Sequence, residues 1–323
     1  MEYISFTLAI IGGIIGLIWS ADRFVLGAST TARNLGVSTL IIGLTIVSFG
    51  TSAPEIITSA TAALRGSPEL AIGNVLGSNI ANIGLVLGIT ALVCPIIIPA
   101  SLLKEELPVL LIVTFAALFI FQDLYLNWLD GTILLVLLAL FTWFVLKIKK
   151  SLSDTKLLEN DEVAEFIADI STAKSLGLMF LGLLTLLVSA NVLVYGATGI
   201  AKAFGVSEVI IGLTVVAIGT SLPELAASVT SVLKGHHELA IGNVVGSNIL
   251  NLLLVLPVPA FLAPLYIDAV VFWRDAGAML AMTLLLTVFL VFKIKSRQKF
   301  GRFLGAVLLL LYLSYTALLF ALS

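Results

Sequence analysis

The stretch Gly50-Thr51-Ser52-Ala53-Pro54-Glu55 and its second copy, Gly219-Thr220-Ser221-Leu222-Pro223-Glu224, decide the fold of this chain. Each copy places one carboxylate in the middle of a long apolar segment. A charged residue at the centre of a membrane helix costs about 2.5–3.5 kcal/mol on insertion, so it is first interpreted as functional. Two such carboxylates, Glu55 and Glu224, predict a cation site.

Each copy also contains a proline that predicts a break in its helix. Pro54 has no N–H to donate to the carbonyl of Gly50, and its ring clashes with that carbonyl, so the helix bends or ends there. Thr51 and Glu55 are four residues apart and share one helical face, with Ser52 beside them. Hydroxyls, a carboxylate and loosened carbonyls are the oxygen ligands that hard cations prefer. The alternative is a simple kink in which Ser and Thr bond back to the helix, but a kink does not require the glutamate.

The composition is that of a polytopic membrane protein. Of the 323 residues, 60% are hydrophobic and 11% are charged, whereas soluble domains have about 45–50% apolar and 25% charged residues. The net charge of −2 argues against a nucleic-acid partner. The single cysteine, Cys94, excludes an internal disulfide.

Runs of about 20 apolar residues predict ten membrane-spanning helices. The predicted spans are about 4–31, 37–64, 70–93, 107–122, 128–146, 176–203, 206–233, 239–264, 268–292 and 303–322. The fourth is barely long enough to cross a bilayer. The only long polar stretch, residues 147–174, is predicted to be a solvated linker or surface helix. It divides the chain into a first five-helix repeat, residues 1–146, and a second, residues 175–323.

The Lys and Arg residues predict the orientation of these spans. Thirteen of the 17 fall in the loops after spans 1, 3, 5, 7 and 9, three fall on the other side, and Arg23 lies inside the first span. Short loops rich in Lys and Arg remain in the cytoplasm. We therefore expect the linker to be cytoplasmic and both termini to lie outside.

An internal repeat relates the two halves. An offset of 169 residues maps Glu55 to Glu224, Gly36 to Gly205 and Asn82 to Asn251, and 30 of the 47 positions in 36–82 are identical in 205–251. Because each half has five predicted spans, an odd number, the second half must enter the membrane upside down. Inverted repeats of this kind build secondary transporters whose site lies near the bilayer midplane.

A second motif is repeated in the third and eighth spans, as GNVLGSNIAN from Gly73 and GNVVGSNILN from Gly242. In the first copy Asn74, Ser78 and Asn82 recur every four positions, so they form a polar stripe on one helix face that can face Glu55. The glycines form a GxxxG pattern, for which close helix packing is the expected role. For the asparagines we favour cation ligation at Asn82 and Asn251 over hydrogen bonding between helices, whereas Asn79 and Asn248 point off the stripe.

The paired motifs resemble the two alpha repeats of the calcium/cation antiporter superfamily, specifically the sodium/calcium exchanger family in its compact prokaryotic form. The resemblance covers the whole chain. It implies an all-α membrane protein with ten transmembrane helices in two inverted five-helix repeats, in which spans 2, 3, 7 and 8 form the ion-binding core and spans 1 and 6 slide. It also implies a Ca²⁺/Na⁺ antiporter of the cytoplasmic membrane that needs no cofactor. The expected partners are Ca²⁺, Na⁺ and the lipid bilayer, and a monomer is expected to be sufficient for transport. The ion-binding residues that it implies are the carboxylates of Glu55 and Glu224, the hydroxyls of Thr51, Thr220, Ser52, Ser221, Ser78 and Ser247, the amides of Asn82 and Asn251, and the backbone carbonyls of Ser48 and Ala217.

One departure from the family pattern leaves the coupling ion open. Members of this compact type often pair the span-3 asparagine with an aspartate in span 8, whereas this chain has asparagine at both positions, Asn82 and Asn251. Two facing carboxylates repel each other when no cation lies between them, which favours protonation of one of them. A Ca²⁺/H⁺ exchanger of the same fold therefore remains the alternative to Na⁺ coupling. A cation channel is less favoured because no repeated pore loop is present.

A further charged residue lies inside the first predicted span. Asp22 is expected to pair with Arg23 or to extend toward the membrane surface. Its repeat mate is Asn191, which argues against a symmetric role in the site.

Overall fold

The computed structural model describes residues 2–156, 170–205, 215 and 217–322. The helices of the first half are α1 (Glu2–Asn34), α2 (Thr39–Ile42), α3 (Ser48–Thr51), α4 (Ala53–Leu64), α5 (Pro68–Ala81), α6 (Gly88–Val93), α7 (Ser101–Lys104), α8 (Glu106–Ile120) and α9 (Trp128–Lys156). Those of the second half are α10 (Thr172–Ala203), α12 (Ala217–Thr220), α13 (Leu222–Leu233), α14 (His237–Leu250), α15 (Pro257–Leu262), α16 (Ala269–Val271), α17 (Gly277–Lys295) and α18 (Arg302–Leu322).

Several of these helices are joined end to end by π-helical turns. The π-helices are η1 (Gly43–Val47), η2 (Asn82–Leu87), η6 (Asn251–Val255) and η7 (Phe272–Ala276), and a short 3₁₀ turn, η3, covers Phe121–Asp123. Two of them, η2 and η6, begin at the repeat-related residues Asn82 and Asn251. Single π turns inside α-helices are frequent at functional sites.

Eight segments within the described ranges are long and apolar enough to cross a membrane. They are Tyr3–Asn34, Thr39–Leu64, Glu69–Val93, Trp128–Val145, Thr172–Ala203, His237–Leu262, Phe272–Lys295 and Arg302–Leu319. The predicted fourth span corresponds to α8, which has only 15 residues. Much of the predicted seventh span, 206–214 and 216, and residues 157–169 of the predicted linker lie outside the described residues. The chain is thus a helical membrane protein.

Two short strands accompany the helices and leave the predicted helical class of the fold unchanged. β1 (Tyr125–Leu126), between α8 and α9, pairs in antiparallel fashion with β2 (Leu265–Tyr266), which follows α15. An isolated bridge joins Ile96, which follows α6, to Phe300, which precedes α18. Ile96 and Leu265 are related by the offset of 169, and each takes part in one of these two backbone pairings. These pairings satisfy backbone groups where helices cannot continue.

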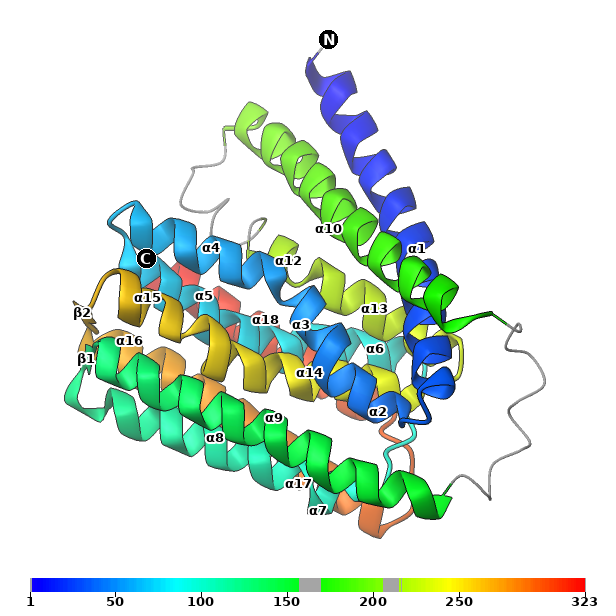
Figure 1. Cartoon of the computed structure of the whole chain (residues 1–323). Coiled ribbons are helices and arrows are strands. Elements are labelled where there is room, and N and C mark those ends of the chain that lie inside the picture. The colour runs from blue at the N-terminus through cyan, green and yellow to red at the C-terminus, as the bar shows by residue number, and fades with distance from the viewer. Residues whose placement is uncertain (1, 157–169, 206–214, 216, 323) are drawn as a thin grey trace.

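The longest two described helices, α1 and α10, lie side by side and run obliquely to the other long helices (Figure 1). Glycines allow them to approach. A Cβ on Gly13 would lie 2.7 Å from the Cβ of Leu193, and a Cβ on the repeat mate Gly182 would lie 2.9 Å from the Cβ of Phe24. Small residues at helix crossings permit this close backbone packing in membranes.

Helix ends are also repeated between the halves. Gly66 follows α4 with φ +76°, and its mate Gly235 follows α13 with φ +80°. A left-handed residue after a helix lets its own N–H and that of the next residue bond the last carbonyls, and glycine adopts this conformation without a Cβ clash. In both copies these bonds form, from Gly66 to Ala63 and from Gly235 to Val232. Repeat-related positions therefore share their backbone conformation as well as their residue type.

Candidate cation site

The predicted helix break is present in both copies of the first motif. Ser52 separates α3 from α4 with φ −80° and ψ 5°, and Ser221 separates α12 from α13 with φ −87° and ψ 0°. Pro54 and Pro223 then occupy the first turn of the new helix, where a missing N–H costs nothing because that N–H has no partner within the helix. Each glutamate also lies in this first turn, where the helix N-terminus favours negative charge.

The two glutamates are fully buried, and they interact across the two halves of the chain. Glu55 and Glu224 are both 0% exposed and lie close enough to repel each other. The Ser52 hydroxyl donates to Oε1 of Glu224 at 3.3 Å. Among the described residues, neither carboxylate oxygen of Glu55 nor Oε2 of Glu224 has a hydrogen-bond partner. Buried polar atoms normally have partners, so these three oxygens are exceptions that the packing of the described residues does not explain.

The second motif holds the first in place by the same contacts in both halves. The Asn74 amide donates to the backbone carbonyl of Glu55 at 3.2 Å and to the Ser59 hydroxyl at 3.0 Å. Its mate Asn243 donates to the Glu224 carbonyl at 3.3 Å and to Ser228 at 3.0 Å. In each case the amide joins the third or eighth predicted span to the backbone of the glutamate that follows the proline. These asparagines were predicted to face the glutamates, but their contact with the backbone was not foreseen.

The hydroxyls near the glutamates differ between the copies. Thr51 is buried and donates to Oδ1 of Asn243 at 3.1 Å, whereas its mate Thr220 lines a cavity. Ser52 donates to Glu224, whereas the buried hydroxyl of its mate Ser221 has no hydrogen-bond partner within the described ranges. The repeat-related serines Ser52 and Ser221 therefore differ in their hydrogen bonding although the residue is the same.

Two further serines lie beside the carboxylates. Ser78 lies next to Glu55 and its mate Ser247 next to Glu224, and both serines are buried. The Ser247 hydroxyl has no hydrogen bond to another described residue. The residues gathered here offer only oxygen ligands, which suit a hard cation.

The two predicted amide ligands are both 0% exposed at the start of their π-helices. The Asn251 amide nitrogen donates to Oδ1 of Asn79 at 3.3 Å, and the Asn79 amide donates to the sulfur of Met279 at 3.4 Å. Asn82 has no hydrogen bond from either side-chain atom to any described residue, nor does the carbonyl oxygen of Asn251. Asn79, which lies off the predicted stripe, therefore accepts a hydrogen bond from Asn251.

The two predicted backbone ligands are less alike. The carbonyl of Ser48 accepts the N–H of Ser52 at 3.0 Å and the hydroxyl of Thr51 at 3.4 Å, so the helical turn already uses it. Ala217 is the first residue of α12. Residue 216 and residues 206–214, which precede it, lie outside the described part of the chain.

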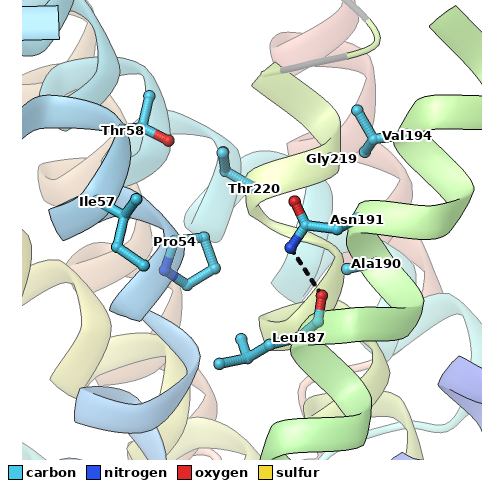
Figure 2. A pocket seen from close by; sticks show the side chains of 9 residues that line it. All are labelled: Pro54, Ile57, Thr58, Leu187, Ala190, Asn191, Val194, Gly219 and Thr220. Carbon is cyan, nitrogen blue, oxygen red and sulfur yellow. Dashed lines mark hydrogen bonds between the residues drawn. The ribbon is translucent and has the colours of Figure 1, made fainter. Parts of the chain in front are cut away.

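A cavity of about 170 Å³ opens beside one copy of the motif. Figure 2 shows Pro54, Ile57 and Thr58 of α4 on one side and Asn191 of α10 on the other, with Thr220 of α12 between them. The Asn191 amide donates to the carbonyl of Leu187 in its own helix at 2.9 Å. The cavity reaches Gly219 and Thr220 at the end of α12, but neither Glu55 nor Glu224 lines it.

Some charged residues behave differently from the predictions or were missed. The prediction that Asp22 pairs with Arg23 is wrong, because Asp22 pairs with Lys234 at 2.6 Å and Arg23 lies over the Trp19 ring. Glu106 and Asp275 form a second pair of buried carboxylates, 3% and 6% exposed, and are related by the same offset of 169. That offset in the sequence is the pattern that could have found them.

Asp275 is held within the protein by hydrogen bonds. It accepts two bonds from the guanidinium of Arg274, at 2.7 and 3.0 Å, and one from the Tyr315 hydroxyl at 3.0 Å. The Tyr315 bond links η7 to α18, and the three bonds together compensate the cost of burying the carboxylate. Asp275 therefore does not need a transported ion as its partner.

Comparison with known proteins agrees with this arrangement. A sequence model of the family described as sodium/calcium exchanger protein matches residues 5–147 and 174–321. The protein CaxA of Alkalimonas amylolytica is 44% identical over 98% of both chains, and the sodium/calcium exchanger MaX1 of Methanosarcina acetivorans is 30% identical over 97% of this chain and 98% of that one. The solved structure of the sodium-calcium exchanger NCX_Mj superposes with a TM-score of 0.82 at 36% identity, over 98% of this chain and 99% of that chain. The chain therefore belongs to the sodium/calcium exchanger family, a family of membrane transporters.

Proposed function

We propose that this protein is a secondary active antiporter that exchanges Ca²⁺ for Na⁺ by alternating access, with the ions bound between Glu55 and Glu224. The observation that carries the proposal is the pair of fully buried carboxylates, one from each half, of which three oxygens have no partner among the described residues. Burying two like charges is strongly unfavourable unless a cation compensates them. A bound cation removes both the repulsion and the missing hydrogen bonds.

Charge and ligand type support a divalent cargo. Two carboxylates balance one Ca²⁺ or two monovalent ions, and the hydroxyls and amides around them add neutral oxygens. Ca²⁺ takes six to eight oxygen ligands in flexible geometry, which a set drawn from four helical segments can supply. The proposed ligands are the twelve predicted residues, with the carboxylates as the main contributors.

The internal repeat supports alternating access. The contacts between α1 and α10 occur in repeat-related pairs: Gly13 meets Leu193 as Gly182 meets Phe24. This reciprocity is expected if a pseudo-twofold axis in the membrane plane relates residues 1–146 to residues 175–323. In such transporters the two halves exchange conformations around a fixed site, so that each side of the membrane gains access in turn.

The names of similar proteins support Ca²⁺ and Na⁺ as the transported ions. MaX1 is named a sodium/calcium exchanger, and NCX_Mj is a sodium-calcium exchanger whose structures include one soaked with Na⁺ and Sr²⁺. Similar proteins also include one from Escherichia coli named an inner membrane protein. We place this chain in the cytoplasmic membrane of a prokaryote, with residues 147–174 in the cytoplasm and both termini outside, as a transporter for which one chain suffices.

A proton-coupled Ca²⁺ exchanger is the second candidate, and a specific observation favours it. Asn82 and Asn251 are both neutral, so a third monovalent ion would find only uncharged oxygens, whereas either glutamate can carry a proton. Both candidates use the same two carboxylates. They differ in which ion occupies the site when Ca²⁺ has left.

Calcium uptake into vesicles under two separately imposed gradients distinguishes these candidates. Vesicles containing the purified protein are loaded with Na⁺ at constant pH, or given a pH difference without Na⁺, and radioactive Ca²⁺ uptake is followed. Na⁺ coupling predicts uptake under the Na⁺ gradient only. Uptake under the pH gradient alone establishes proton coupling, and uptake that follows neither gradient contradicts antiport.

A further inference from the structure

The two seams between the long helices and the core are related by the repeat but differ in structure. We call the contact between α1 and α13 the first seam and the contact between α10 and α4 the second seam. The offset of 169 maps each position in the second seam to one in the first: Thr58 to Ala227, Asn191 to Asp22 and Arg65 to Lys234. The two seams can therefore be compared position by position.

The first seam is closed. Ala227 of α13 is 1% exposed and belongs to one apolar cluster with Ala21, Phe24 and Val25 of α1. At the end of α13, the Lys234 ammonium lies 2.6 Å from the Asp22 carboxylate. The seam thus combines apolar contact along its length with one ion pair at its end.

The second seam is open. The cavity of about 170 Å³ lies between α4 and α10, and Ile57 on α4 remains 65% exposed (Figure 2). Asn191, which occupies the position of Asp22, donates its amide to Leu187 of its own helix. Within the described ranges, the Asn191 side chain makes no hydrogen bond to α4.

The charges at the two seams also differ. Lys234 and Arg65 each follow the C-terminus of a helix, where a cation is favourable in any case. The acid, however, is present only in the first seam, because Asp22 is replaced by the neutral Asn191. His236, close to Lys234, adds no competing positive charge at neutral pH, because burial and then Lys234 lower its pKa.

We propose that the ion pair between Asp22 and Lys234 is a latch that biases this transporter toward the state in which the first seam is closed and the second is open. The proposal rests on the proposed alternating access, in which the two seams exchange conformations. In the exchanged state Asp22 separates from Lys234, while Arg65 meets only the neutral Asn191. The opposite closure therefore lacks an ion pair, and the two access states are unequal in free energy.

The expected size of the bias is modest. Lys234 is 30% exposed and Asp22 is 45% exposed, so water weakens their attraction. Ion pairs of this exposure correspond to roughly a two- to fivefold change in an equilibrium constant. Removing the pair should therefore raise the population with an open first seam by roughly that factor.

The test measures how often the first seam opens. In a Cys94→Ser background, Ala227→Cys places a thiol on α13 that faces α1, and a water-soluble maleimide labels it only when the seam opens. With purified protein in nanodiscs, both membrane faces are accessible to the reagent. Adding Asp22→Asn should raise the labelling rate two- to fivefold, and Lys234→Gln should do the same.

The double variant and a charge reversal identify the pair itself. Asp22→Asn with Lys234→Gln should label no faster than either single variant, and Asp22→Lys with Lys234→Asp should return the rate toward the parent value. As a second reporter, labelling of Thr58→Cys in the cavity should slow when Asp22 is neutralised. This reporter retains the native packing of the first seam.

The matched control is Arg65→Gln, which removes the repeat-related positive charge and should leave labelling of Ala227→Cys unchanged. The latch is refuted if Asp22→Asn changes neither reporter, or if Arg65→Gln raises labelling as much as Lys234→Gln. Ca²⁺ flux is measured in the same background. Absence of flux there would contradict the proposed function, whereas labelling needs no flux and tests the latch separately.

Discussion

The two copies of the glutamate motif have nearly the same sequence but different surroundings. In the first copy, Thr51 and Ser52 are buried and donate hydrogen bonds across to Asn243 and Glu224. In the second, Thr220 lines a cavity and the Ser221 hydroxyl has no hydrogen bond within the described residues. Since the residues are the same, the difference is conformational. One duplicated sequence thus packs differently in the two halves of the chain.

The orientation of the two copies gives the largest expected contrast. Ser67 and His236 occupy the same place in the turn after α4 and α13, and the proposed inversion of the repeats puts these turns on opposite sides of the membrane. In intact cells with Cys94→Ser, we expect an impermeant thiol reagent to label Ser67→Cys and not His236→Cys. Labelling of His236→Cys becomes complete after the cells are opened, which controls for reactivity. Equal labelling of both in intact cells would rule out inversion.

The two glutamates should be equally necessary despite their unequal hydrogen bonds. Glu55→Gln and Glu224→Gln each remove half of the charge of the site, so each should lower Ca²⁺ transport in vesicles by roughly 100-fold or more. Glu69→Gln, at an exposed carboxylate in the first turn of α5, is the control and should transport normally. Wild-type transport by both site variants would show that the ions bind elsewhere.

The glycines at the crossing of α1 and α10 should be equivalent between the copies. Gly13→Ala and Gly182→Ala each introduce a Cβ within 3.0 Å of the opposite helix, and each should destabilise the protein by about 1–3 kcal/mol. Gly12→Ala and Gly177→Ala are matched controls, since a Cβ there meets no described atom within 4 Å. The readout is the midpoint of thermal unfolding in detergent. Unchanged midpoints for Gly13→Ala and Gly182→Ala would mean that the crossing is loosely packed.

The asparagines should show the smallest and most asymmetric effect. Asn82→Asp adds a carboxylate where the side chain has no hydrogen bond to a described residue, so it should lower the Na⁺ concentration for half-maximal exchange by roughly threefold. Asn251→Asp loses the bond that its amide donates to Asn79, which should offset part of this gain. Ca²⁺ flux is measured against Na⁺ at several pH values, because a protonated new acid would shift the pH dependence instead. If folded variants show neither change, these asparagines lie away from the ions.

The repeat and the helix breaks were predictable because they follow from residue identity and covalent structure. An offset of 169 is visible in the sequence, and proline lacks an N–H wherever it occurs. The same offset predicts that Asn74 and Asn243 make equivalent contacts, as they do. Local chemistry thus predicted the elements that carry the site.

The asymmetry was not predictable, because equal sequences give equal expectations. The π-helices at Asn82 and Asn251 were also missed, since one extra residue in a turn leaves the apolar pattern nearly unchanged. The pairing of Asp22 with Lys234 depends on how α1 crosses α13, more than 200 residues away in sequence. Such contacts are fixed by tertiary packing, and nearest neighbours such as Arg23 are a poor guide to them.

The length of α1 and α10 has a consequence for the lipid surroundings. They have 33 and 32 residues, which at 1.5 Å per residue gives about 50 Å, against a hydrocarbon core of about 30 Å. Both must tilt strongly, and α1 presents Ile4, Leu8, Ile15 and Ile18 outward along its length. Changing bilayer thickness alters the preferred tilt of a helix that is too long for it. Acyl-chain length is therefore expected to act on these two helices first, and through them on the balance between the two access states.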